Sequence, residues 1–245
     1  MGKIIAVVSG KGGTGKTSFT ASVGICLANS GAKVLCLDCD IALRNLDLAL
    51  GLSDRAIMDF SDVIMGRCTL DEAVVPHEKY SSVHLLAAPL SNGDLPITTE
   101  QMKSLGNSIR EVYDYCLVDA PAGFTQGFRW AVAMADRVVV VTTTDPSSLR
   151  DAQRTVQELQ YFPNGRLHLV VNRVQKKLLK TMRTNIDDAI DTAGLPLLGV
   201  IPEDEDVSHI LGRGLPLRDN NYYSAIAYEN IAKRLRGQHA PLMKL

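Results

Sequence analysis

A glycine-rich loop near the amino terminus constrains the fold of this chain more than any other feature. Residues 10–17 read GKGGTGKT and match the pattern G-x-x-x-x-G-K-[ST] in full. An apolar run, residues 4–8, precedes the loop, and a helix-like stretch, residues 18–29, follows it. A strand, a glycine turn and a helix start are the setting in which backbone N–H groups converge on phosphate oxygens. The stretch therefore predicts a phosphate-binding loop.

Individual residues of this loop have distinct predicted roles. Lys16 offers a positive charge to the terminal phosphates of a nucleotide, and the hydroxyl of Thr17 is placed to bind Mg²⁺. Lys11 is a second lysine within the motif. Side chains of such a loop point away from its own nucleotide, so Lys11 is either a solvated lysine or one that serves the nucleotide of a second subunit. The predicted nucleotide-binding residues of this segment are Gly12, Gly13, Thr14, Gly15, Lys16, Thr17 and Ser18.

Aspartates follow two of the buried strands. Asp38 and Asp40 come at the end of the apolar run 33–38, and Asp119 ends the run 115–118. The carboxyl ends of parallel strands form the edge where α/β proteins bind ligands, and an aspartate after an apolar strand is the Walker B arrangement that holds Mg²⁺. One of the first two aspartates is alternatively a cap for the next short helix, but caps by both are not expected.

Apolar runs alternate with amphipathic stretches along the whole chain. This alternation predicts an α/β fold with a doubly wound, mostly parallel sheet flanked by helices. No repeat or linker interrupts it, so residues 1–245 are expected to form one domain with a short tail, 238–245. The expected strands are 4–8, 33–38, 83–88, 115–118, 137–141, 167–171 and 197–201. The main expected helices are 18–29, 98–112, 126–135, 149–159, 184–193, one that opens at 202–206, and 223–235, and the run 98–101 suits an N-cap.

Composition narrows the classes of partner. The formal net charge is −1 and 5% of the residues are aromatic, so neither overall charge nor stacking residues favour nucleic acid. Five cysteines without a secretory signal indicate reduced thiols in the cytosol. Cys36 and Cys39 form a C-x-x-C, but their spacing on a strand places them on opposite faces, which favours two small core residues over a redox or metal site.

Two later segments leave alternatives open. Asn172 follows the expected strand 167–171, where its amide could bind a base edge or simply occupy a strand-end turn. A basic cluster follows at Lys176, Lys177, Lys180 and Arg183. It could contact phosphates of DNA or lipid, although a solvated helix face is the better interpretation because no aromatic residue or glycine lies between the charges.

These motifs, taken together, resemble those of the deviant Walker A ATPases, the MinD/ParA family, and most closely the branch that regulates placement of the bacterial division site. The resemblance covers nearly the whole chain in the order of the family. The motifs are KGGTGKT at 11–17, LDCD at 37–40, LRNLD at 43–47, VDAPAG at 118–123, PSSLRDA at 146–152, VNR at 171–173 and IPED at 201–204.

The resemblance implies roles for particular residues. Lys11 is implied to reach the partner's phosphates in an ATP-dependent homodimer, and Asp40 to position the attacking water, so that Lys11, Lys16 and Asp40 are the catalytic residues. Thr17, Asp38 and Asp119 are implied to hold Mg²⁺ or its waters. Asn172, with Pro202 and Glu203, is implied to form the adenine pocket. The cofactors implied are ATP and Mg²⁺.

The implied activity is a slow, Mg²⁺-dependent hydrolysis of ATP to ADP that a partner stimulates. The implied partners are regulatory proteins of the MinC/MinE type or analogues of them. The alternative is a ParA-like ATPase that positions cargo or chromosomes on nonspecific DNA, with the basic cluster as its contact; nucleic acid is not the favoured partner. An iron–sulfur carrier of the same superfamily is disfavoured because Cys116 lies within its strand and no cysteine follows it.

One feature of the family is not matched. Its members carry an amphipathic membrane-targeting helix beyond the last core helix, whereas residues 238–245 are few and contain Pro241. Membrane contact through such a helix is therefore not expected of this sequence. The expected location is the cytoplasm, or the inner face of the cell membrane if the native chain extends further.

Overall fold

The computed structural model describes residues 1–90, 95–163, 165–175, 186–204, 207 and 223–242. The strands are β1 (Lys3–Val8), β2 (Val34–Asp38), β3 (Val75–Pro76), β4 (Val83–Leu86), β5 (Tyr115–Asp119), β6 (Arg137–Thr142), β7 (Leu167–Val174) and β8 (Leu197–Pro202). The helices are α1 (Lys16–Asn29), α2 (Leu46–Ala49), α3 (Phe60–Ile64), α4 (Leu70–Ala73), α5 (Thr99–Val112), α6 (Gln126–Met134), α7 (Pro146–Glu158), α9 (Ile186–Ala193) and α11 (Tyr223–Leu235).

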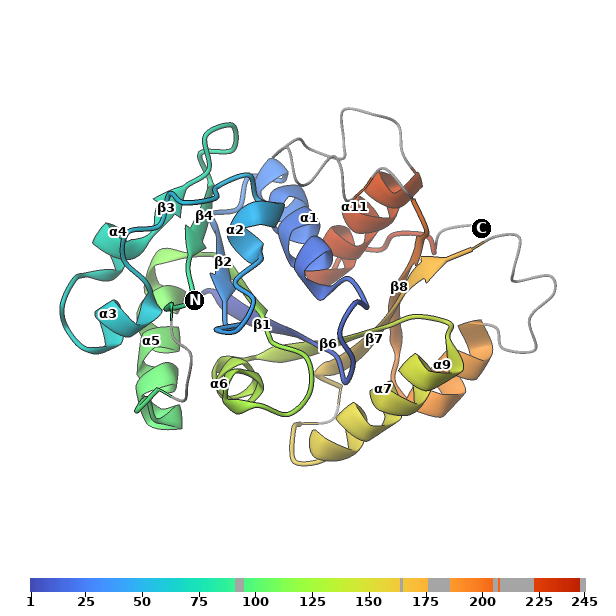
Figure 1. Cartoon of the computed structure of the whole chain (residues 1–245). Coiled ribbons are helices and arrows are strands. Elements are labelled where there is room, and N and C mark those ends of the chain that lie inside the picture. Colours follow the sequence, from blue (N-terminus) through green and yellow to red (C-terminus); the bar gives the residue numbers. More distant parts are fainter. Residues whose placement is uncertain (91–94, 164, 176–185, 205–206, 208–222, 243–245) are drawn as a thin grey trace.

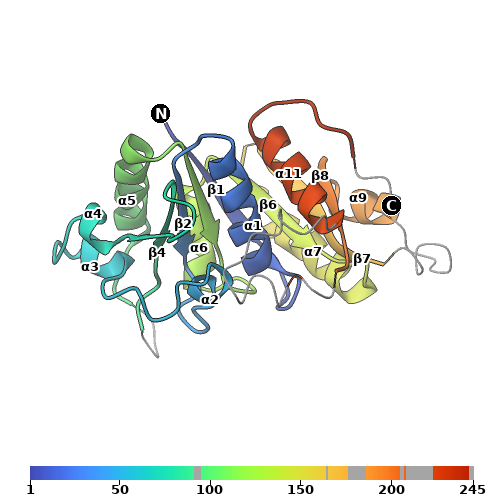
Figure 2. The same ribbon diagram turned by 90° about the horizontal axis from the view of Figure 1, so that it is seen from above.

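The strands form one sheet in the order β3-β4-β2-β5-β1-β6-β7-β8. The short edge strand β3 pairs antiparallel with β4, and the other strand pairs are parallel. Helices α1 and α11 cover one face of the sheet, and α5, α6, α7 and α9 cover the other (Figures 1 and 2). The predicted doubly wound, mostly parallel α/β fold is confirmed.

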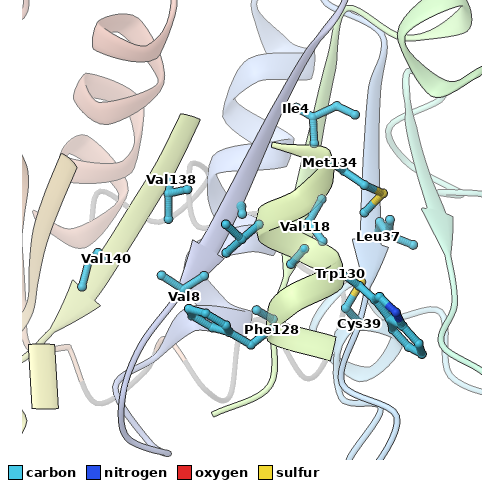
Figure 3. Packing of buried hydrophobic residues seen from close by; sticks show 14 of the residues in the cluster. Ile4, Val8, Leu37, Cys39, Val118, Phe128, Trp130, Met134, Val138 and Val140 are labelled. Atoms are coloured by element: carbon cyan, nitrogen blue, oxygen red, sulfur yellow. The ribbon is translucent and has the colours of Figure 1, made fainter. Parts of the chain in front are cut away.

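The strand β1 runs through the centre of the sheet and shows why both faces are apolar. Ile5 and Val7 pack in the same cluster as Phe19 of α1 and Tyr228 of α11. Ile4, Ala6 and Val8 face the opposite layer, where Val8 lies next to Phe128 of α6 (Figure 3). Successive side chains of a strand alternate between faces, so a strand buried on both sides must be apolar throughout.

Two sequence expectations about individual residues are confirmed. Cys36 and Cys39 are fully buried and belong to the clusters on opposite faces of the sheet. Burial raises the pKa of the Cys36 thiol to about 12, so it stays protonated at neutral pH. Thr98 caps α5, because its side chain accepts a hydrogen bond from the Gln101 N–H while the Gln101 side chain accepts one from the Thr98 N–H.

Several element boundaries differ from the expected ones. Helix α7 begins at Pro146 rather than 149, because the Asp145 side chain caps it and a proline at the first helical position has no N–H to leave unpaired. Helix α1 begins at Lys16, directly within the loop, and β7 continues to Val174. The antiparallel strand β3 was not expected, since its two residues are too short to show a periodic pattern.

The basic cluster at Lys176, Lys177, Lys180 and Arg183 lies outside the described residues, as does most of the helix expected to open at 202–206. Residues 202–204 are not helical, because Pro202 still belongs to β8. In the described part of the chain, no helix combines the length and the apolar character needed to cross a membrane.

Candidate functional site

The loop and the aspartates meet at the carboxyl edge of the sheet. Strand β1 leads into the loop, and its neighbour β5 ends at Asp119, which pairs in register with Val7. Strand β2 lies on the other side of β5, and its Asp38 pairs in register with Asp119. Residues that are about 80 to 110 positions apart in sequence are therefore side by side because three parallel strands end together.

The loop leaves the amino end of α1 open for an anion. Gly15 occupies the N-cap position at a φ of 91°, a left-handed conformation that favours glycine. No side chain caps the helix, and its first turn contains no acidic residue. A phosphate group would therefore meet free backbone N–H groups and the positive end of the helix dipole.

A serine that the sequence analysis did not single out holds the loop lysine. Lys16 is 8% exposed, and its Nζ donates a hydrogen bond of 2.9 Å to the Oγ of Ser9. That hydroxyl in turn donates a hydrogen bond of 2.6 Å to the carbonyl oxygen of Lys11. Burial lowers the pKa of Lys16, while the charges of Asp119 and Asp40 act in the opposite direction. The only available signal for Ser9 was a small hydroxyl residue between the strand and the loop.

Thr17 and Asp119, two of the predicted metal-binding residues, are in direct contact. The hydroxyl of Thr17 donates a hydrogen bond of 2.6 Å to Oδ2 of Asp119. The other carboxylate oxygen, Oδ1, is buried and has no hydrogen-bond partner among the described residues. Burial raises the pKa of Asp119 to about 7, although the Thr17 hydroxyl and the Lys16 charge oppose this shift. A buried acceptor without a partner is a position that a cation could satisfy.

Asp38 and Asp40 also hold the chain that follows β2. Asp38 is 1% exposed, and its carboxylate accepts hydrogen bonds from the N–H groups of Asp40 and Leu46, at 2.8 and 3.1 Å. Asp40 is half-buried and accepts a hydrogen bond of 3.1 Å from the Leu43 N–H. The N-cap residue of α2 is Asn45, so neither aspartate occupies the cap position that was the alternative, although Asp38 accepts the N–H of Leu46, the first residue of that helix. Burial and the neighbouring Asp119 raise the pKa of Asp38.

Lys11 is held within its own chain. Its Nζ donates a hydrogen bond of 2.7 Å to the Oγ of Ser147 and lies 3.4 Å from the Asp145 carboxylate. Both partners lie at the start of α7, at the edge of the loop, and the Lys11 side chain is 46% exposed. Neither contact was visible in the sequence, because 134 and 136 residues separate the partners.

A second group of predicted residues surrounds a cavity beside the loop. Asn172, Pro202 and Glu203 line a cavity of about 210 Å³ together with Gly15 and Ser18. A neighbouring cavity of about 330 Å³ is lined by residues 11–14, by the start of α7 and by Arg173. The two cavities adjoin, because Arg173 and Glu203 line both of them, and the three residues predicted to bind the base all line the smaller one.

The donor set fits a nucleotide with Mg²⁺. Hydroxyl and carboxylate oxygens are the ligands that Mg²⁺ prefers, and Thr17, Asp38 and Asp119 supply them at one point. The buried, unpartnered Oδ1 of Asp119 is the observation that tests this fit. Among the described residues no group of three or more His, Cys, Asp and Glu side chains forms a metal cluster.

Comparison with known proteins agrees with this geometry. Residues 5–217 match the model of the CobQ/CobB/MinD/ParA nucleotide binding domain. The septum site-determining protein MinD of Synechocystis is 39% identical over 99% of this chain and 92% of its own length. The chain belongs to the MinD family.

Solved structures of MinD proteins have the same fold. MinD in the MinC:MinD cell division protein complex of Aquifex aeolicus superimposes with a TM-score of 0.90, at 35% identity, over 99% of both chains. MinD from Pyrococcus horikoshii, solved in complex with Mg-ADP, superimposes with a TM-score of 0.81, at 28% identity, over 96% of both chains. These MinD structures agree with the predicted family and with its P-loop architecture.

Proposed function

We propose that this chain is a MinD-like ATPase that regulates where the cell divides. In this proposal it binds ATP with Mg²⁺, forms a homodimer in that state, and hydrolyses ATP to ADP slowly until a partner stimulates it. The observation that carries the proposal is one loop that presents two lysines, one buried beside the Thr17–Asp119 pair and one at the exposed rim.

The chain's own groups would divide the chemistry between them. Lys16 and the amino end of α1 would bind the terminal phosphates, while Thr17, Asp38 and Asp119 would hold the metal and its waters. Bound Mg²⁺ supplies positive charge to the phosphate oxygens during hydrolysis. Asp40, which is half-buried beside this group, would orient a water molecule. Asn172, Pro202 and Glu203 would surround the adenine.

The exposed lysine supports a site completed by a second copy. Lys11 contacts the Ser147 hydroxyl and the Asp145 carboxylate at the start of its own α7, and its side chain remains 46% exposed. The ammonium could therefore leave these two groups and bind a phosphate of a second subunit. Positive charge delivered in trans would then stabilise the transition state, as an arginine finger does in other P-loop enzymes. Hydrolysis would release the two subunits, and the cycle would act as a switch.

Lys11→Ala tests this proposal. We expect the wild-type chain to sediment as a dimer with ATP and Mg²⁺ and as a monomer with ADP, and the variant to remain a monomer in both. Lys103→Ala, an exposed lysine of α5 far from the loop, is the matched control and should dimerise normally. A Lys11→Ala chain that dimerises with ATP as the wild type does would contradict the trans role.

A second arm of the same experiment addresses Asp40. If Asp40 orients the attacking water, Asp40→Ala should bind ATP, form the dimer and release phosphate at least tenfold more slowly than the wild type, since positioned general acid–base groups typically contribute a factor of about 10² or more. Phosphate release at the wild-type rate would exclude this role.

The proposed partners follow from the relatives. The Aquifex MinD chain was solved in complex with MinC, so a MinC-type protein is the partner we propose. A MinE-type stimulator is implied by the resemblance of the motifs alone, and we propose it on that ground. ATP use places the proposed activity in the cytoplasm. The ParA-like alternative has less support, since the relatives that match over nearly the whole chain are MinD proteins.

A further inference from the structure

We propose that Asn172 is a positioning residue of the phosphate loop, and that it couples the base cavity to that loop. This inference rests on the proposed nucleotide binding and adds to it: the adenine role predicted for Asn172 concerns only the base, whereas the structure places its side chain against the loop itself. A group that contacts both parts would make phosphate binding depend on the same residue as base binding.

The side-chain amide of Asn172 is already engaged. Its Nδ2 donates a hydrogen bond of 2.8 Å to the carbonyl oxygen of Thr14, and its Oδ1 accepts one of 2.9 Å from the N–H of Arg173. Asn172 is 5% exposed. The opposite orientation of the amide would place oxygen against the Thr14 carbonyl and nitrogen against the Arg173 N–H, so these two neighbours determine the orientation.

The hydrogen bond between Asn172 and Thr14 joins residues that are 158 positions apart in the sequence, on either side of one strand of the sheet. The loop follows β1, Asn172 lies in β7, and β6 lies between them. An irregularity of β7 accompanies it: Arg173 has a φ of 54°, and the register with β8 shifts between Val171 and Val174. Those two valines pack in the same core cluster, although a regular strand would place residues three apart on opposite faces. Such bulges re-aim side chains and are common beside active sites.

The loop packs closely on this amide at Gly15. A Cβ atom at Gly15 would lie 2.3 Å from Nδ2 of Asn172, far inside contact distance. The glycine is therefore needed here for two reasons, its left-handed φ of 91° and the presence of Asn172. Thr14, whose carbonyl accepts the hydrogen bond, is 2% exposed, so water does not readily replace the amide.

The amide still has capacity for a ligand. An asparagine side chain has two N–H donors and two acceptor lone pairs, and its hydrogen bonds to the described residues use one of each. The remaining donor and acceptor belong to a residue that lines the cavity of about 210 Å³. A base bound there would hold the amide in the orientation that supports the Thr14 carbonyl. In this way one side chain would hydrogen-bond to the loop and also contact the bound base.

A ligand that has phosphates but no base distinguishes support of the phosphate loop from recognition of the base. We would measure the binding of ATP and of inorganic tripolyphosphate, each with Mg²⁺, to the wild type and to Asn172→Ala. The coupling predicts that the variant loses about tenfold or more in affinity for both ligands, the effect of losing one hydrogen bond that supports the site. A role in base recognition alone predicts weaker ATP binding and unchanged tripolyphosphate binding, and that result would overturn the inference.

Hydrogen exchange of the ligand-free protein gives an independent readout. Amides of residues 11–17 should exchange faster in Asn172→Ala and in Asn172→Leu, which keeps the volume of the side chain, while β1 and β5 keep their protection. Unchanged exchange in the loop would refute the inference, even if tripolyphosphate binds the wild type too weakly to measure. Asn107→Ala, on the surface of α5, should behave as the wild type. A wild-type chain that binds no ATP would instead refute the proposed function.

Discussion

At the scale of single residues, the position of Lys16 depends on a hydrogen bond to a group that carries no charge. Ser9 links the Lys16 ammonium to the Lys11 carbonyl, so a neutral hydroxyl fixes both the lysine and the loop. An ammonium buried without an acceptor would be costly. The position of Lys16 before any ligand binds is therefore set by a residue outside the loop motif.

Ser9→Ala should weaken ATP binding. Hydrogen bonds to charged groups contribute about 1.5–3 kcal/mol, so we expect a roughly tenfold or larger increase in the dissociation constant by isothermal titration calorimetry. Ser30→Ala is a matched control, because Ser30 also donates a hydrogen bond of 2.6 Å to a carbonyl, but at the far end of α1. Equal affinities in Ser9→Ala and the wild type would show that Lys16 needs no such support.

Asp119 gives the metal-free protein a dependence on pH. Its pKa in the folded chain is about 7, above the ordinary value of 3.8, so between these values the folded state binds a proton that the unfolded state has released. Stability therefore falls as pH rises from about 4 to about 7, and this loss is complete above pH 7.

Asp119→Asn should remove this loss. Without Mg²⁺ and nucleotide, we expect the variant to be more stable than the wild type at pH 8, by up to about 4 kcal/mol for a shift of about three pKa units, and the difference to shrink towards pH 4. Urea unfolding at pH 4, 5, 6, 7 and 8 measures it. A difference between the two proteins that does not change with pH would contradict this explanation.

At the scale of elements, close approach between α1 and the sheet depends on one glycine. A Cβ atom at Gly24 would lie 2.7 Å from Sγ of Cys36 in β2 and 3.5 Å from the Leu117 side chain in β5. Helix α1 begins at the loop, so its distance from the sheet also sets where Lys16 and Thr17 lie.

Gly24→Ala should destabilise the protein by about 1–3 kcal/mol, because overpacking outweighs the better helix propensity of alanine. The clash is with one atom, so Cys36→Ala should relieve part of it. In a double-mutant cycle by urea unfolding, we expect a favourable coupling of at least about 0.5 kcal/mol. Additive effects of the two substitutions would mean that Cys36 is not the obstacle.

At the scale of the whole molecule, the proposed ligand would connect elements from most of the sheet. The loop follows β1, the acidic residues follow β2 and β5, and the base cavity lies beside β7 and β8. Binding at such a place stabilises the folded chain as a unit, because the unfolded chain has no site.

ATP with Mg²⁺ should therefore raise the unfolding temperature of the whole protein. At an ATP concentration about 100 times the dissociation constant, the gain is about 2.7 kcal/mol, or roughly 5–10 °C for a chain of this size. Scanning fluorimetry measures the shift, which EDTA should largely remove and Lys16→Ala should abolish. A full shift in the presence of EDTA would show that the metal contributes little to binding.

The sequence by itself determined the location of the phosphate loop, the α/β alternation and the two buried aspartates. These features are local: the loop is a contiguous motif, and each aspartate ends its own apolar strand. The capping of α5 by Thr98 was also readable, because the residues that form the capping box are three apart. The start of α7 was missed, although Asp145 and Pro146 offered a local signal for it.

Only the tertiary structure decided what supports the loop from outside. Lys11 contacts Ser147, and Asn172 contacts Thr14, across 136 and 158 residues. Whether two distant side chains meet depends on the order of the strands and on irregularities such as the one at Arg173, which turn a side chain from one face towards another. A periodic pattern in the sequence indicates which face of the sheet a residue occupies. Which distant residue it contacts on that face depends on the packing of the whole sheet.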